Sequence, residues 1–218
     1  MPIPKVPIDY LHAPTHDVQS KVTPDDAIKL LISGNNRFIN NLELKRNHLE
    51  NVHLTAQQQS PYATILGCID SRVSPELIFD LGIGDIFDVR VAGNFINDDI
   101  IGSIEYACTV AGSKLVLIMG HTNCGAIKGA IDKIKIGKIK NLIEKIEPAV
   151  QEAGKQFGER NSKNQLLVDN VSFINVKHSI KNLLDRSKLI LDLKNEGKIK
   201  VIGGMYHVDT GKVNFFEG

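Results

Sequence analysis

The sequence predicts an α/β fold in which helices flank a mostly parallel central β-sheet. Three short runs, residues 63–67, 85–91 and 115–119, have the length of strands, and the first and third are also apolar. A pattern typical of a helix follows each run, so strands and helices alternate along the middle of the chain. Strands that alternate with helices are joined by right-handed crossovers and lie parallel in one sheet. No repeat or shift of composition marks a second domain, and we expect a single domain over residues 1–218.

The first part of the chain, residues 1–40, is predicted to be an N-terminal helical arm. Residues 1–22 contain prolines and histidines without periodicity and indicate an extended lead-in. Thr23 offers an N-cap for a helix that is expected to run to about Asn40, with an interruption near Gly34.

The other elements are predicted from apolar spacing and from turn residues. Helices are expected at residues 74–82 and 98–112, from Gly125 onward and over most of 138–195 with interruptions at Pro148 and Gly158, and strands at 198–203 and 212–216, whereas 41–60 receives no element. Within this part, residues 128–145 alternate lysine with isoleucine or leucine. That spacing predicts an amphipathic helix with a solvated outer face.

Composition excludes several classes of partner. The 218 residues are 42% hydrophobic and 23% charged, and the formal net charge is +1. This balance is typical of a globular protein and provides no field that would attract nucleic acid or an anionic membrane. No apolar stretch reaches the length of a membrane span, and the N-terminus lacks the apolar core of a signal peptide. We therefore expect a cytoplasmic protein with no nucleic-acid or membrane partner.

Potential metal ligands follow two of the predicted strands. Cys68 and Asp70 come directly after the first strand, and His121 and Cys124 after the third. Ligands bind at the carboxyl ends of parallel strands, so the fold can bring these side chains together. Two thiolates and one imidazole form a plausible tetrahedral zinc set, whose fourth position is left for water or for Asp70.

Each of these residues, taken singly, also has a structural interpretation. A lone cysteine is more often a small buried hydrophobe than a ligand, and Cys108, within a helical pattern, is interpreted as a core residue. Arg72 is either the partner of Asp70 in a structural ion pair or the group that holds the Asp70 carboxylate away from the metal. The coincidence of two clusters at neighbouring strand ends favours the metal site.

The sequence resembles the beta-class carbonic anhydrases from about residue 27 to residue 216. The motifs that carry the resemblance are residues 34–38 (GNNRF), 68–76 (CIDSRVSPE), 84–94 (GDIFDVRVAGN), 103–107 (SIEYA), 120–126 (GHTNCGA) and 206–213 (YHVDTGKV). Several long motifs in the same order are far more specific than one short pattern.

The resemblance implies an enzyme, a carbonate dehydratase of the carbon–oxygen lyase class. It would hydrate carbon dioxide reversibly to bicarbonate and a proton through a zinc-bound hydroxide. One Zn²⁺ per subunit is expected on Cys68, His121 and Cys124, with Asp70 and Arg72 as the catalytic dyad. Asp70 would itself ligate zinc only in a closed, inactive state. The substrate side would include Gln59, Gly125, Phe87, Ala92 and Tyr106.

Family members assemble, so a homodimer or homotetramer is expected. In the family the N-terminal helix embraces a neighbouring subunit, and the active site lies at the dimer interface. Some members bind bicarbonate at an inhibitory site that uses a tryptophan. Here Ile65 occupies that position, although Arg90 and Tyr206 match the other two residues of the site.

Two other functions remain open from the sequence. One is a zinc hydrolase of carbonyl sulfide or carbon disulfide, which would use the same fold and metal. The other is a catalytically inactive, zinc-stabilised binding module, which would not need the Asp70–Arg72 pair.

Overall fold

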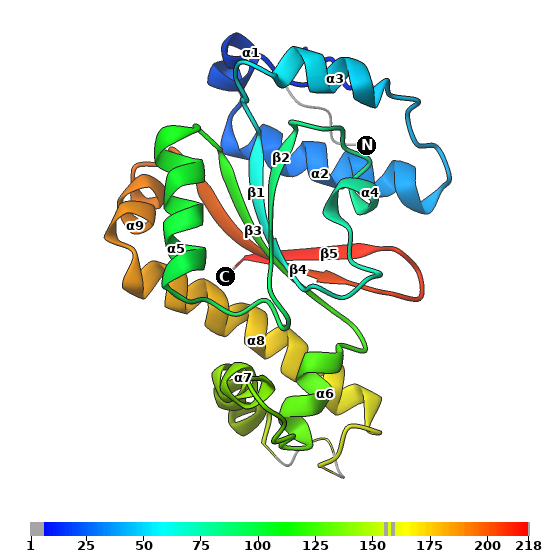
Figure 1. Ribbon diagram of the computed structural model, residues 1–218, viewed down its shortest axis with the longest axis vertical. Coiled ribbons are helices and arrows are strands. Elements are labelled where there is room, and N and C mark those ends of the chain that lie inside the picture. The colour runs from blue at the N-terminus through cyan, green and yellow to red at the C-terminus, as the bar shows by residue number, and fades with distance from the viewer. Residues whose placement is uncertain (1–6, 155–156, 158–159, 218) are drawn as a thin grey trace.

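A five-stranded sheet forms the centre of the molecule in the computed structural model, which describes residues 7–154, 157 and 160–217 (Figure 1). Its strands are β1 (Ala63–Gly67), β2 (Ile86–Arg90), β3 (Leu115–His121), β4 (Lys200–Tyr206) and β5 (Val213–Glu217). They lie in the order β2-β1-β3-β4-β5, with only β5 antiparallel to its neighbour. The predicted fold class, a mostly parallel sheet with flanking helices, is confirmed.

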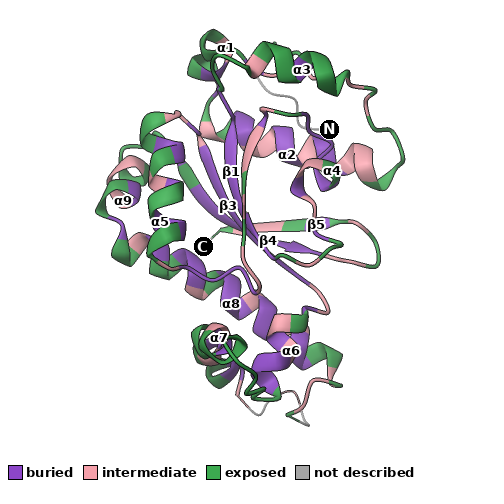
Figure 2. Cartoon of the chain, in the orientation of Figure 1, coloured by how far each residue is buried: buried purple, intermediate pink, exposed green. Residues whose placement is uncertain are grey.

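Helices cover both faces of the sheet, and a further group of helices lies beyond one end of the sheet (Figure 1). They are α1 (His16–Lys21), α2 (Pro24–Ile39), α3 (His48–Thr55), α4 (Pro75–Ile78), α5 (Asp98–Glu105), which continues as the π-helical turn η1 (Tyr106–Val110), α6 (Gly125–Ile131), α7 (Ile139–Ala153), α8 (Gln165–Arg186) and α9 (Lys188–Asn195). Helices α2 and α4 pack on one face, and α5, α8 and α9 on the other. The central strands β1, β3 and β4 are therefore buried on both sides, whereas the edge strands β2 and β5 are partly exposed (Figure 2).

A third apolar cluster lies beyond the carboxyl ends of the strands. Residues of α6, α7 and the first half of α8 pack there, and Cys68 and Cys124 belong to this cluster. Both cysteines are thus held by packing from their own chain. None of the described helices is long and apolar enough to cross a membrane.

Helix α2 begins as predicted, with Thr23 as its N-cap, but it does not break at Gly34. A Cβ atom on Gly34 would lie 1.7 Å from the carbonyl oxygen of Phe79. The glycine therefore lets α2 contact the backbone after α4, and this packing outweighs the weak helix propensity of glycine. Through Ala27, Leu30 and Leu31 the helix packs on its own sheet; its contact with a neighbouring subunit stays a prediction.

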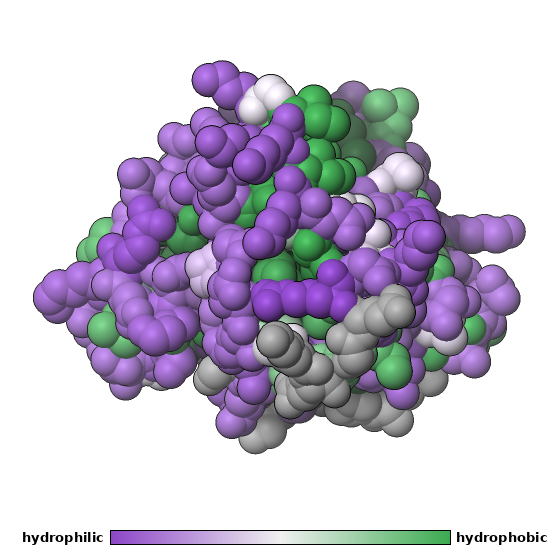
Figure 3. Space-filling model, turned by 90° about the horizontal axis from the view of Figure 1, so that it is seen from below, coloured by the Kyte–Doolittle hydropathy of each residue, from purple (hydrophilic) through white to green (hydrophobic). Residues whose placement is uncertain are grey.

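The basic stretch 128–145 is not one helix, which corrects the prediction. Helix α6 ends at Ile131, α7 begins at Ile139, and the residues between them are not helical. Lys133 (φ 54°) and Gly137 (φ 44°) take left-handed conformations that interrupt a helix. The face of the molecule over these helices is mostly hydrophilic, with hydrophobic residues visible between the polar ones (Figure 3).

Three further predictions about helices need correction or lie outside the described residues. Helices α1 and α3 form where no helix was predicted, each capped by a polar side chain that precedes it. Pro148 lies inside α7 without ending it, because Ile146, Ala149 and Val150 around it are buried against other helices. The predicted interruption at Gly158 lies outside the described residues.

Candidate metal centre

Cys68, His121 and Cys124 form one buried cluster, although 53 residues separate the first from the second along the chain. Their ligand atoms all lie within 4.8 Å of one another, and the two sulfurs are 4.0 Å apart. Cys68 follows β1 directly, His121 is the last residue of β3, and Cys124 is the N-cap of α6. The adjacent parallel strands β1 and β3 therefore bring the two sequence clusters together, as predicted.

The His121 ring presents one free nitrogen to the two sulfurs. Its Nδ1 lies 2.9 Å from the carbonyl oxygen of Thr122, which fixes the tautomer with the proton on Nδ1. The side chain is fully buried, and Nε2 has no hydrogen-bond partner. A buried nitrogen lone pair without a donor is costly, and a divalent metal between Nε2 and the sulfurs would satisfy it. The donor set therefore fits zinc.

The thiols of Cys68 and Cys124 are hydrogen-bonded to each other. A hydrogen bond from Cys124 lowers the pKa of Cys68, with further contributions from His121 and from the backbone N–H of Gly93. The pKa of Cys124 is raised, because its hydrogen bond to Cys68 and its burial both favour the thiol. The Gly93 nitrogen lies 3.4 Å from the Cys68 sulfur. Cys68 is therefore the sulfur that ionises first, and a metal would displace the remaining proton.

Arg72 binds the carboxylate of Asp70 through a bidentate pair of hydrogen bonds. Its Nε lies 2.9 Å from Oδ1 and its Nη2 2.8 Å from Oδ2, and its backbone nitrogen lies 3.0 Å from Oδ1. The hydrogen bonds from Arg72 hold the pKa of Asp70 well below its usual range. Asp70 Oδ2 is 3.9 Å from Nε2 of His121. The carboxylate thus stands beside the cluster as an anion while the guanidinium holds both of its oxygens.

The comparisons with known proteins agree with this geometry. A family model described as carbonic anhydrase matches residues 63–213. Carbonic anhydrase 2 of Mycobacterium tuberculosis is 34% identical over 87% of this chain and 91% of its own length. The solved beta-carbonic anhydrase CafA of Aspergillus fumigatus superposes with a TM-score of 0.70 at 28% identity, covering 78% of this chain and 81% of that one. The chain belongs to the beta-class carbonic anhydrase family.

One further solved structure supports the fold. It is one of two tetrameric beta-carbonic anhydrases from Sordaria macrospora, with a TM-score of 0.68 at 20% identity over 88% of this chain and 97% of that one. Membership in the family confirms the predicted enzyme class, because carbonic anhydrases hydrate carbon dioxide.

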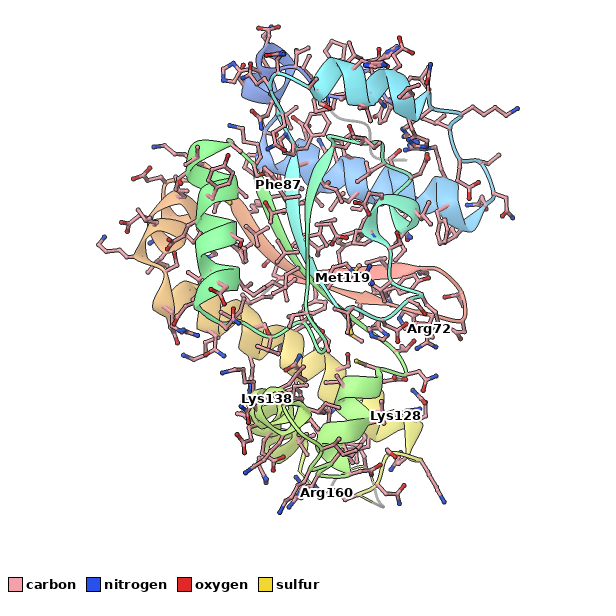
Figure 4. The ribbon with its side chains drawn as sticks, in the orientation of Figure 1. Arg72, Phe87, Met119, Lys128, Lys138 and Arg160 are labelled. Atoms are coloured by element: carbon pink, nitrogen blue, oxygen red, sulfur yellow. The ribbon has the colours of Figure 1, made fainter. Side chains whose placement is uncertain are left out.

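The residues expected on the substrate side of this carbonic anhydrase fall into two groups. Gly125 is the first residue of α6, directly after Cys124, and Ala92 precedes Gly93, so both lie at the cluster. Phe87 pairs with Thr64, four residues before Cys68, at the opposite end of β2 from the cluster. Figure 4 shows Phe87 on this part of β2, away from Arg72.

Tyr106 and Gln59 belong with Phe87 rather than with the cluster of their own chain. The rings of Phe87 and Tyr106 meet edge to face at 6.3 Å between centroids. Gln59 lies ahead of β1, whereas Cys68 lies after it. Within one protomer these three residues are not brought to the metal ligands, and their place in the carbonic anhydrase site stays a prediction.

Sequence reasoning missed the residues that hold the ligand loops. Arg90 donates from Nε to the carbonyl of Cys68 at 2.9 Å and from Nη2 to that of Asp70 at 2.7 Å. The long helix α8 carries a row of polar side chains, of which Asp169 and Ser172 bond the backbone at Asn123 and His121, and Asn175 and Ser179 bond the neighbouring turn at Gly93 and Asn94. Their spacing of three or four residues along an otherwise apolar helix face was the signal in the sequence.

Proposed function

We propose that this carbonic anhydrase is zinc-dependent and hydrates carbon dioxide reversibly to bicarbonate and a proton. One Zn²⁺ per subunit binds Cys68, His121 and Cys124. The observation that carries the proposal is the buried, unpartnered Nε2 of His121, which faces two sulfurs 4.0 Å apart. Three protein ligands leave a tetrahedral ion one open position, which is the mark of a catalytic rather than a structural site.

When bound, zinc supplies a Lewis acid and lowers the pKa of a water molecule that it carries. The side chains and backbone of the protein orient the reacting groups. The Asp70 carboxylate would accept a hydrogen bond beside the bound metal, and Arg72 holds both oxygens of that carboxylate in place. Gly125, at the start of α6, has an open surface where its backbone N–H meets the substrate.

Arg72 also keeps the site open. Asp70 Oδ2 is 3.9 Å from His121 Nε2, so a side-chain rotation toward the metal would let the carboxylate take the fourth position. That state would be closed and inactive. The bidentate contact with Arg72 opposes this rotation, because both carboxylate oxygens are occupied.

We further propose a homodimer or homotetramer with shared active sites. Strand β2 is at the edge of the sheet. Antiparallel pairing of two β2 strands would place the first residues of one strand beside the last residues of the other. Gln59, Phe87 and Tyr106 of one protomer would then line the metal site of its partner. The tetrameric relatives from Sordaria macrospora support assembly.

We also propose a cytoplasmic location, which the state of the cysteines supports. All three, Cys68, Cys108 and Cys124, are buried and free. Free thiols persist in reducing compartments, and two of these three are needed for the metal.

Stopped-flow hydration of carbon dioxide, with zinc content measured on the same sample, tests the function. We expect turnover that scales with bound zinc and rises from neutral to alkaline pH. Parallel assays with carbonyl sulfide and carbon disulfide separate the hydrolase alternative, which predicts faster turnover of those gases. Zinc-loaded protein that turns over none of the three gases would instead support the inactive binding module.

A further inference from the structure

Helix α8 holds the backbone around the metal ligands through buried polar side chains. Ser172 donates to the carbonyl of His121 at 3.0 Å, and Asp169 accepts from the backbone N–H of Asn123 at 2.9 Å. Asn175 donates to the carbonyl of Gly93 at 2.8 Å. Asn175 is only 2% exposed. A polar group this deeply buried destabilises a fold unless it is bonded, so the bond to Gly93 is its compensation.

Gly93 occupies a turn that needs to be held in place. The Asn94 nitrogen lies 2.9 Å from the Val91 carbonyl, which closes a four-residue turn with Gly93 at its third position. Gly93 has φ 82° and Asn94 φ 41°, both in the left-handed region. Only glycine adopts the first value without strain, and a non-glycine residue at the second is strained. Such a turn persists because surrounding contacts fix it.

The turn directs one N–H group at a metal ligand. The Gly93 nitrogen lies 3.4 Å from the Cys68 sulfur, while the Gly93 carbonyl is bonded to Asn175. A Cβ atom on Gly93 would meet Ile146 Cδ1 at 2.6 Å and Ala126 Cβ at 3.3 Å. The turn is therefore enclosed by α6, α7 and α8, and Asn175 is the side chain of α8 that bonds Gly93 itself.

An N–H donor to a thiolate draws electron density away from the sulfur. Two thiolate ligands supply more charge to zinc than imidazoles do and so reduce its acidity. Hydrogen bonds to a ligand orient it and tune the metal. The N–H of Gly93 would partly offset the donation from Cys68 and so favour an acidic metal.

We infer that Asn175 is a positioning residue of the metal centre: it anchors the turn so that the Gly93 N–H donates to Cys68, which makes that thiolate a weaker donor to the metal. The inference rests on the proposed function, because it needs a metal on Cys68. In this inference, helix α8 influences the acidity of the metal although it supplies none of the metal ligands.

The test replaces Asn175 in the full chain and reads the metal directly. Asn175→Leu is similar in size and removes the donor, and Asn175→Ala removes most of the side chain. In cobalt-loaded protein we expect the thiolate-to-cobalt charge-transfer band to move to lower energy, because a thiolate without its N–H donor is easier to oxidise. Zinc affinity, measured by competition with a chelator, should fall by about 10–100-fold, because the loss of the contact that orients Cys68 outweighs the stronger donation from its sulfur.

Ser179→Ala is the matched control. Ser179 donates to the carbonyl of Asn94 at 3.0 Å, from the same helix to the neighbouring residue of the same turn. Its loss should lower the melting temperature without moving the cobalt band. If both substitutions move the band equally, the effect belongs to the turn as a whole and the role of Asn175 is wrong.

A measurement on the unmodified protein does not depend on whether the variants fold. After loading with a spin-half cadmium isotope, the amide proton of Gly93 should show a coupling to the metal through the hydrogen bond to Cys68. No such coupling, or a cobalt band unmoved in Asn175→Leu, overturns the inference. Unmodified protein that binds neither zinc nor cobalt overturns the proposed function instead.

Discussion

At the residue scale, the chemistry depends on where one carboxylate is held. Asp70 is two residues from Cys68, yet it is not part of the cluster of Cys68, His121 and Cys124, because Arg72 holds both of its oxygens. The planar guanidinium fixes the orientation of the carboxylate and also neutralises its charge. The same pair in the sequence was compatible with a structural ion pair, and the short distance from Asp70 to His121 is what favours the catalytic interpretation.

Arg72→Ala should lower turnover by about 100-fold to 10,000-fold, the usual contribution of a positioned proton acceptor. Zinc content should remain close to that of the unmodified protein, because Arg72 contacts none of the three ligand atoms through its side chain. Stopped-flow hydration and metal analysis on one preparation check both parts. Arg72→Lys keeps the charge without the planar guanidinium and should show an intermediate loss. Full activity in Arg72→Ala would remove Arg72 from the mechanism.

Asp85 gives a pH-dependent stability that is independent of the metal. Burial raises its pKa from 3.8 to about 6, although the carboxylate accepts an N–H from Gly82 at 2.7 Å. The folded protein therefore holds this proton more tightly than the unfolded chain does. Its contribution to the free energy of unfolding falls as the pH rises from 3.8 to about 6, and the loss is complete above that pH.

Asp85→Asn should remove this loss, because the amide oxygen still accepts from Gly82 and carries no charge. Between acidic and neutral pH, the free energy of unfolding of the variant should rise by about 1–3 kcal/mol relative to that of the unmodified protein. Urea unfolding at a series of pH values measures the difference. Asp209→Asn, at an exposed carboxylate, is the control. Parallel pH profiles for unmodified protein and Asp85→Asn would show that burial of Asp85 has no such effect.

At the element scale, the crossing of α2 over α4 explains the GNNRF motif. Gly34 allows the close approach to Phe79. Asn35 donates to the carbonyls of Ile78 and Gly211 and accepts from the Val213 nitrogen at 2.9 Å. Helix α2 is thereby joined to α4 and to the start of β5. The motif belongs to the scaffold of the sheet rather than to the metal site.

Helix propensity and packing predict opposite changes in the free energy of unfolding for Gly34→Ala. Alanine should stabilise a helix by about 1 kcal/mol over glycine. The added methyl group would overlap the Phe79 carbonyl, so we expect a net destabilisation of at least about 1–3 kcal/mol by chemical unfolding. Asn36→Ala, on the same helix, should instead stabilise by up to about 0.7 kcal/mol. A Gly34→Ala variant as stable as the parent would contradict the crossing.

At the scale of the whole molecule, the proposed zinc ion would join the ends of two neighbouring strands to the helical layer beyond them. Removing zinc with a chelator should lower the free energy of unfolding by about 3–4 kcal/mol relative to protein with free zinc at 100–1,000 times its Kd. Calorimetry with and without chelator measures this. Cys124→Ser should be insensitive to the chelator. Equal melting temperatures for the unmodified protein in both conditions would contradict a metal on this cluster.

Shared active sites predict complementation between two inactive chains. Cys124→Ser lacks a metal ligand, and a Gln59→Ala, Phe87→Ala chain lacks the residues expected from the partner. In a mixed dimer, the intact metal site of the second chain faces the intact Gln59 and Phe87 of the first. Mixing should restore part of the hydration rate, with sedimentation velocity confirming the dimer. No recovery in mixed dimers would confine each site to one protomer.

The central strands β1 and β3 were the most predictable, because each is a short apolar run bounded by turn residues. Residues 63–67 form β1 as predicted, and the third strand extends two residues further, to His121. The helices were less predictable where local propensity and packing disagree, as at Gly34 and Pro148. Helices α1 and α3 were missed because their sequences are polar, and each is capped by the side chain that precedes it.

The sequence by itself determined which residues can bind the metal, because thiolate, imidazole and carboxylate chemistry belongs to residue type and because strand ends of a parallel sheet meet at one edge. Only the tertiary structure decided that Arg72 holds Asp70, that Arg90 and α8 hold the ligand loops, and that Phe87 and Tyr106 lie away from the metal ligands of their own chain. Those features depend on distances between groups far apart in the sequence. Such distances are set by how helices and strands pack, and residue spacing does not contain them.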